Sequence, residues 1–175
     1  MNNILIAGFG GQGILFCGKF IVQAAMQIGK EVSWMPSYGP EMRGGTANCS
    51  VIISDAPIGS PIVDKPDILI VMNRPSMDKF ENACVPSAKI FIDSSLIDRK
   101  GMRGDVDYKY IPATALADEN NLTGLANMIM IGYVIKQTGI ISADILKYTM
   151  EKTVPERKSA LRDANLRALD IGQRF

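Results

Sequence analysis

The chain opens with a short apolar run that is followed by a helical pattern. Residues 3–7 form a compact apolar segment typical of a buried strand. Residues 13–28 then place apolar side chains at helical spacing, and Gly29 stands where a helix commonly ends. Residues 31–35 return to an extended pattern that we expect to stop at Pro36. This order predicts a first strand-helix-strand unit.

The middle of the chain predicts further strands. Residues 46–54 alternate apolar and polar positions, as a half-buried strand does. Asp55-Ala-Pro57 can reverse the chain, so we expect residues 58–63 to pair with that strand in an antiparallel hairpin. Compact or alternating apolar patterns predict strands at 67–72, 89–93 and 106–110, and a helix at 75–84. The sheet is therefore expected to be mostly parallel, and mixed if the hairpin forms.

The last third of the chain turns helical. Its patterns predict helices at 113–118 and 123–137, one opened by Ser142, and a last one after Thr153. Thr153-Val-Pro-Glu156 matches the spacing of a capping box. Strands first and helices last predict an α/β protein, specifically a three-layer α/β/α Rossmann-like domain with a helical C-terminal end.

An apolar stripe runs along the predicted last helix. It consists of Leu161, Ala164, Ala168 and Ile171. Such a stripe fits packing on the helix's own domain or docking on a partner.

Composition limits the classes of function. A chain of 175 residues with 47% hydrophobic content suits one core, so we expect a single domain over residues 1–175. Nineteen basic and eighteen acidic residues leave a net charge of +1, which does not favour binding to nucleic acid or to an anionic membrane. The N-terminal apolar run breaks at Gly8, and the longest later one, residues 125–135, is too short to span a bilayer. We expect a cytoplasmic protein.

The cysteines predict no metal chemistry in this chain. Cys17, Cys49 and Cys84 are widely spaced, and the sequence contains no histidine. We interpret all three as core residues and expect this chain to bind no metal or iron-sulfur cluster.

A glycine-rich motif lies between the first predicted strand and the first predicted helix. Gly8-Phe-Gly-Gly-Gln-Gly13 fits G-x-G-x-x-G, so Gly8, Gly10, Gly11, Gln12 and Gly13 are candidate ligand-binding residues. Glycines there would let a phosphate approach backbone N–H groups at the positive end of a helix. A turn that needs glycine only for its shape remains the alternative.

The identity of the anion is narrowed by a missing acid. Dinucleotide sites usually carry Asp or Glu at the end of the second strand, about 20 residues beyond the glycines. Here Ser33, Trp34 and Met35 stand in that region. The sequence therefore disfavours NAD(P).

A second loop motif spans residues 36–45, Pro-Ser-Tyr-Gly-Pro-Glu-Met-Arg-Gly-Gly. Arg43 could clamp a phosphate or carboxylate, and Glu41 could hold Arg43 or a partner chain. A solvated ion pair on a surface loop is an equally good reading from the residue types alone. The candidate partner-contact residues are Tyr38, Glu41, Arg43, Gly44 and Gly45.

The two motifs together resemble a known family. GFGGQGI followed by PSYGPEMRGGTANCSVIIS is similar to the gamma subunit of 2-oxoacid:ferredoxin oxidoreductases, in particular the 2-oxoglutarate and branched-chain 2-oxoacid (2-oxoisovalerate) branch. The likeness continues through PDILIVMN, FIDSS and IPAT.

The resemblance implies a division of labour. Thiamine diphosphate and Mg would be held by alpha and beta subunits, iron-sulfur clusters by partner subunits that include a ferredoxin-like delta subunit, and ferredoxin would accept the electrons. Gamma would complete the complex and contact coenzyme A, a substrate, at the glycine turn. The isolated chain would then be inactive, and no catalytic residues are predicted in it.

The residues by themselves also allow two other functions. One is a stand-alone nucleotide- or CoA-binding Rossmann-like protein, which the glycine motif alone would allow. The other is an NAD(P) oxidoreductase, which the missing acid opposes.

Overall fold

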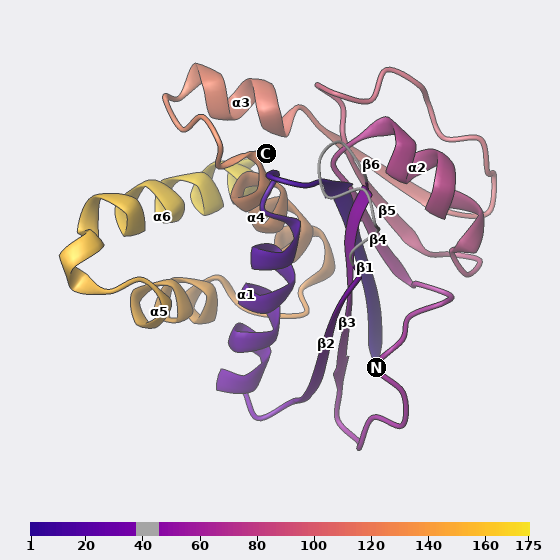
Figure 1. The fold of residues 1–175 in the computed structure, drawn as a ribbon, viewed down its shortest axis with the longest axis horizontal. Helices are drawn as coiled ribbons and strands as arrows, with labels where there is room; N and C mark the ends of the chain where they lie inside the picture. The colour runs from indigo at the N-terminus through magenta and orange to yellow at the C-terminus, as the bar shows by residue number, and fades with distance from the viewer. Residues whose placement is uncertain (38–45) are drawn as a thin grey trace.

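The computed structural model describes residues 1–37 and 46–175, which form one six-stranded sheet with helices on both faces (Figure 1). The strands are β1 (Asn2–Phe9), β2 (Glu31–Ser37), β3 (Thr46–Ser54), β4 (Ile68–Val71), β5 (Lys89–Asp93) and β6 (Asp107–Ile111). The helices are α1 (Ile14–Gln27), α2 (Arg74–Phe80), α3 (Ala113–Glu119), α4 (Ala126–Thr138), α5 (Ala143–Thr153) and α6 (Ser159–Arg174), with short 3-10 turns η1 (Glu81–Ala83) and η2 (Glu156–Lys158). The predicted α/β class with a helical C-terminal end is confirmed.

The sheet is mixed. Its strand order is β2-β3-β1-β4-β5-β6. The four strands β1, β4, β5 and β6 are parallel to one another. β3 is antiparallel to both of its neighbours, β1 and β2. The predicted hairpin between residues 46–54 and 58–63 is therefore wrong, because the strand that pairs with β3 on its far side is β2. Residues 58–63 form no strand, and prolines at 57 and 61 remove N–H groups that a ladder would need.

β2 extends two residues beyond its predicted end at Met35. Pro36 lies within the strand, in register with Cys49 of β3, and Ser37 follows in register with Asn48. β2 is the edge strand of the sheet, and an edge is where a strand tolerates proline.

Of two other predicted helix starts, one is confirmed and one is wrong. The hydroxyl oxygen of Ser142 accepts a hydrogen bond from the Ile145 N–H at 3.4 Å, so the predicted start of α5 is confirmed. The predicted capping box at Thr153 is wrong, because Thr153 ends α5 and α6 begins at Ser159. The Thr153 hydroxyl donates instead to Gln23 Oε1 of α1 at 3.2 Å.

The helices divide unequally between the two faces. α1 and α4 lie on one face of the sheet with α5 and α6 outside them, whereas α2 lies on the other face (Figure 1). Alternate residues of β1 serve the two cores, with Ile4 and Ile6 in the larger and Leu5 in the smaller. The two cores share the strands of one sheet.

All three cysteines are buried, as predicted. Burial raises the pKa of the Cys49 thiol to about 12, against an opposing effect from the Trp34 indole N–H. Burial also raises the pKa of Cys84 to about 11. These thiols are side chains of the core.

α4 and α6 cross at two glycines. A Cβ on Gly132 would lie 2.1 Å from the Leu169 carbonyl oxygen, and one on Gly172 would lie 1.9 Å from the Ile129 carbonyl oxygen. The two helices therefore approach backbone to backbone. α4 is buried between α6 and the sheet, with every residue from Asn127 to Ile135 buried.

The connection from β5 to β6 is held by polar contacts. Glu81, which is 1% exposed, accepts hydrogen bonds from Arg99 Nη2 at 2.8 Å, the Met102 N–H at 2.9 Å and the Tyr108 hydroxyl. Parallel strands are usually joined through a helix. Here these contacts hold a connection, residues 94–106, in which the structure has no helix.

No helix within the described ranges combines the length and the apolar character that crossing a bilayer requires.

Candidate phosphate-binding site

The glycine turn lies where the sequence predicts it. β1 ends at Phe9 and α1 begins at Ile14, so the turn lies at the edge of the sheet where β1, β4 and β5 end. Phe9, Gly10 and Gly11 are exposed. Gly13 is the N-cap residue of α1, and within the described residues no side chain caps the helix. The first N–H groups of a helix have no acceptor inside it, which makes this helix start a candidate anion site.

Two glycines of the turn have positive φ. Gly11 has a φ of +95° and Gly13 a φ of +73°, values that side chains rarely adopt. A Cβ on Gly13 would also lie 2.3 Å from Asn127 Nδ2, whereas one on Gly11 would meet nothing within 4 Å. α4 therefore closes one side of the turn at Gly13, and the space around Gly11 is open.

Gln12 supports the turn from within. Its Oε1 accepts from the Phe9 N–H at 2.6 Å, and its Nε2 donates to the Met72 carbonyl oxygen at 2.9 Å. Its own backbone N–H donates to the Phe9 carbonyl at 3.2 Å. Gln12 therefore joins the ends of β1 and β4 and fixes the direction of the neighbouring N–H groups.

A cleft of about 260 Å³ opens beside the turn. It is lined by Gly11, Gln12, Met72, Leu96, Thr114, Ala117, Asp118, Thr123, Gly124, Ala126 and Asn127. Among these described residues Asp118 alone carries an ionisable side chain, and its carboxylate accepts from the Thr123 hydroxyl at 2.9 Å. An anion at this cleft would therefore be held by peptide N–H groups rather than by a cationic wall.

Asp93 fixes the far wall of the cleft, and sequence reasoning missed it. Its carboxylate accepts from the Thr114 hydroxyl at 2.6 Å and from the Ser95 N–H at 3.0 Å, and its side chain is fully buried. These bonds set the start of α3 against the end of β5. The available signal was an aspartate directly after a buried apolar run, in FIDSS.

The second motif falls outside the described residues. Tyr38, Glu41, Arg43, Gly44 and Gly45 all lie between β2 and β3, where the structure gives no description. The flanking residues are placed, because Thr46 pairs with Phe9 in the β1–β3 register. The described neighbours of this motif, Ser37 and Thr46, thus lie at the edge of the sheet that carries the glycine turn.

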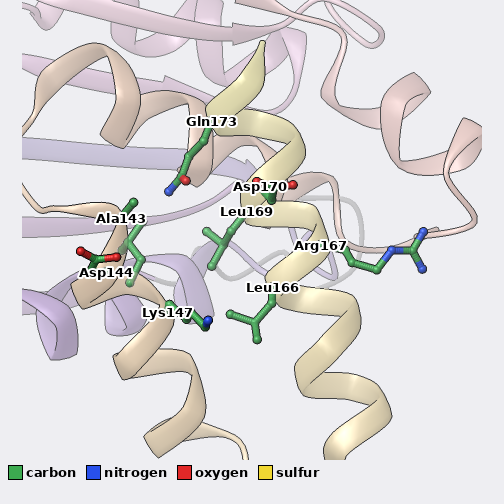
Figure 2. Close-up of a pocket in the computed structure, with 9 residues that line it drawn as sticks. Ala143, Asp144, Lys147, Leu166, Arg167, Leu169, Asp170 and Gln173 are labelled. Carbon is green, nitrogen blue, oxygen red and sulfur yellow. The ribbon is translucent and has the colours of Figure 1, made fainter.

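A second hollow of about 390 Å³ lies between α5 and α6 (Figure 2). Leu166 and Leu169 point into it, while Arg167 points away and donates to the Asn120 carbonyl at 3.3 Å. Its charged lining residues are Asp144, Lys147, Arg167 and Asp170. Ala143 and Asp144 at the start of α5 line it, but the Ser142 hydroxyl already accepts a hydrogen bond from the first turn of that helix. The N-cap residue of α1 is a glycine and provides no such cap, so the glycine turn is the stronger candidate site.

A glycine turn that opens α1 at the C-terminal edge of β1 defines a Rossmann-like α/β domain suited to holding an anionic group. Residues 3–175 match the family model described as pyruvate ferredoxin/flavodoxin oxidoreductase. The chain belongs to this family.

Individual relatives agree with the family. The chain is 38% identical to ketoisovalerate oxidoreductase subunit VorA of Methanothermobacter thermautotrophicus, over 97% of this chain and 35% of that protein. It is 35% identical to 2-oxoglutarate synthase subunit KorC of Methanocaldococcus jannaschii, over 98% of this chain and 91% of that protein. It thus spans about a third of VorA but nearly all of KorC.

A solved structure has the same fold. The gamma subunit of a keto/oxoacid ferredoxin oxidoreductase from Geobacter sulfurreducens superimposes with a TM-score of 0.85 at 26% identity, over 99% of this chain and 97% of that one. The resemblance seen in the two sequence motifs is confirmed.

Proposed function

We propose that this chain is the gamma subunit of a thiamine diphosphate-dependent 2-oxoacid:ferredoxin oxidoreductase that acts on 2-oxoglutarate or a branched-chain 2-oxoacid. The complex would convert the 2-oxoacid, coenzyme A and oxidised ferredoxin into acyl-CoA, carbon dioxide and reduced ferredoxin. The observation that carries this proposal is the match along nearly the whole chain to relatives named as ketoisovalerate oxidoreductase and 2-oxoglutarate synthase subunits.

The chemistry is proposed to reside in the partner chains. Alpha and beta subunits would hold thiamine diphosphate and Mg, and partner subunits, including a ferredoxin-like delta subunit, would hold the iron-sulfur clusters. The complex would work in the cytoplasm, with ferredoxin as its acceptor.

The glycine turn would contribute the phosphate contacts of coenzyme A. Gly8, Gly10, Gly11, Gln12 and Gly13 would present backbone N–H groups, with Gln12 acting through the shape of the turn. The open space at Gly11, the uncapped start of α1 and the adjacent cleft support this role. Arg43 would add a cationic contact, and Tyr38, Glu41, Gly44 and Gly45 would contact a partner subunit.

Assembly tests the subunit assignment. We expect the chain, co-expressed with thiamine-binding and ferredoxin-like subunits from the same organism, to co-purify with them. The complex should reduce ferredoxin with a 2-oxoacid and coenzyme A, and the isolated chain should not. Turnover by the isolated chain would contradict the proposal.

A charge-only comparison at Gly11 tests the phosphate contact. Gly11→Asn and Gly11→Asp impose similar backbone strain at a positive φ and differ chiefly in charge. We expect the assembled complex with Gly11→Asp to bind coenzyme A at least about tenfold more weakly than the one with Gly11→Asn, measured by isothermal titration, because a carboxylate would repel the phosphate.

Gly29 provides the matched control. It has a φ of +72° and open space around it, but it follows the C-terminal end of α1. Gly29→Asp and Gly29→Asn should bind coenzyme A alike. Equal affinities for the two Gly11 variants would place the phosphates elsewhere while leaving the subunit assignment intact.

A further inference from the structure

One half of the sheet has a face that no helix covers within the described residues. α2 packs on β1 and β4, and the outward side chains of β2 and β3 extend beyond it. Val32 and Trp34 of β2 and Cys49 and Val51 of β3 point to the larger core, so the alternate residues point the other way. Ile52 and Ser54 of β3 also lie on this side but are buried. We give the name outer β2–β3 face to five alternate residues that are at least partly exposed: Ser33, Met35, Ser37, Asn48 and Ser50.

A hollow of about 420 Å³ lies on this face. In the strand register Ser50 stands between Met35 and Leu5, and its short side chain leaves space between two larger ones. Leu5, Val63, Phe80 and Ala83 are among the apolar lining residues. The hollow is therefore shaped for an apolar side chain that enters from outside.

The edge of the hollow has the character of a protein interface. Met35 and Ile62 are exposed large apolar side chains, at 40% and 53%. Asp64 and Lys79 provide one charge of each sign. An apolar centre with a polar surround that carries no net charge fits a protein surface better than a nucleic acid or an anionic lipid.

The lengths of the relatives indicate which protein would bind to the outer β2–β3 face. The unit spans 35% of VorA and 91% of KorC, so the same domain occurs both as a third of a longer chain and by itself. A covalent link supplies a high effective concentration, which a separate subunit lacks. A separate subunit therefore needs a surface that holds its neighbour without the link.

The position of the face fits that neighbour. Asn48 of β3 pairs with Ala7 near the end of β1, and Ser37 of β2 pairs with Asn48 one strand further out. A subunit seated on the outer β2–β3 face would extend to the edge of the sheet where the coenzyme A site is proposed.

We propose that the outer β2–β3 face and its hollow bind the larger subunit that corresponds to the remaining two thirds of the VorA chain, through an apolar side chain inserted between Met35 and Ile62. This inference rests on the proposed function, since it assumes that the chain assembles with that subunit.

Charge substitutions at the exposed apolar residues test it. We expect Met35→Glu and Ile62→Glu each to raise the dissociation constant for the larger subunit at least about tenfold in biolayer interferometry, because a carboxylate would have to be buried. Met26→Glu is the matched control, because Met26 is 58% exposed on α1 on the other side of the sheet, and this variant should bind within about twofold of wild type. Thermal melting of each variant alone checks that the fold is intact.

The outcomes separate the two proposals. If the wild-type chain does not bind the subunit, the proposed function and this inference both fail. If it binds, and the two glutamate variants bind equally well, only the docking surface is wrong. If light scattering shows a wild-type homodimer that the two variants abolish, the face joins copies of this chain and the inference is overturned.

Discussion

At the scale of single residues, Gln12 connects two strand ends through its side chain. Its side chain receives a hydrogen bond from the end of β1 and gives one to the end of β4. Both bonds are made at the edge of the sheet that carries the turn, so a substitution at Gln12 changes the geometry of the turn. This makes Gln12 a residue that positions the donors beside it.

We predict that Gln12→Glu lowers the free energy of unfolding by about 1–2 kcal/mol at neutral pH. The glutamate keeps an acceptor for Phe9 but loses the donor to Met72 and places a carboxylate against a carbonyl oxygen. Urea denaturation measures the effect. Gln23→Glu is the control, because the side-chain bond of Gln23 among the described residues is one that it accepts from the Thr153 hydroxyl, and a glutamate can still accept it. A change of less than about 0.5 kcal/mol is expected. Equal effects at both positions would contradict the proposed support of the turn.

At the scale of elements, the crossing of α4 and α6 depends on backbone contact. Gly172→Ala would place a methyl group 1.9 Å from a backbone oxygen, which cannot move aside as a flexible side chain can. The gain in helix propensity, about 1 kcal/mol, is smaller than the cost of pushing two packed helices apart.

We therefore predict that Gly132→Ala and Gly172→Ala each destabilise the fold by roughly 1–3 kcal/mol, seen as a lower melting temperature in calorimetry. Gln173→Ala, the next residue on α6, should change stability by less than about 0.5 kcal/mol. Glycine variants as stable as wild type would mean that the helices do not cross at these positions.

The connection between β5 and β6 makes stability depend on pH. Burial alone would raise the pKa of Glu81, but hydrogen bonds from Arg99, Tyr108 and the Met102 N–H hold it below its ordinary value of 4.5. A lowered pKa in the folded state contributes stability that is present above pH 4.5 and is lost as the pH falls through the folded-state pKa.

We predict that Glu81→Gln reduces stability at pH 7 by about 1–3 kcal/mol, because a neutral amide cannot replace the charged acceptor. The variant should also lose less stability than wild type when the pH is lowered from 5 to about 3. Chemical denaturation across this pH range gives both quantities. Parallel pH profiles for the two proteins would show that Glu81 does not contribute.

Local sequence patterns predict some strands and helices well and do not predict how distant ones pair. β1, α1 and β5 carry strong local periodicity, and their predicted positions are confirmed within a few residues. β2 was not recognised as the partner of β3, because a long connection separates them and Pro36 suggested an end. The hydroxyl of Thr153 bonds to Gln23, which lies far away in the chain and leaves no local signal.

The candidate site also has one part that the sequence predicts and another that it does not. The glycine turn could be located from sequence because its strand, glycines and helix are contiguous. Met72, Thr114 and Asn127 line the adjacent cleft from three other parts of the chain, and only the folded sheet brings them together. Gly11 stands at a variable position of the G-x-G-x-x-G pattern, so the pattern does not predict its positive φ.

At the scale of the whole molecule, both cores share one sheet. Ile68 and Ile70 belong to one core and Leu69 to the other, so displacement of β4 would disrupt both cores. This arrangement predicts one cooperative unit over residues 1–175.

The single tryptophan provides the test. Trp34 lies on the edge strand and packs on the larger core, whereas far-UV circular dichroism reports on all helices. We predict that fluorescence and circular dichroism give the same midpoint in urea. Two separate midpoints would divide the chain into more than one folding unit.

The absence of a capping side chain at the start of α1 has a consequence for the conditions under which the turn can work. A peptide amide neither gains nor loses a proton between acidic and alkaline solution, unlike a histidine or a lysine. If backbone amides alone hold the phosphate, the pH dependence of its binding would come from the ligand and not from the turn. Added salt, which screens the helix dipole, would lower the affinity of the turn for the phosphate.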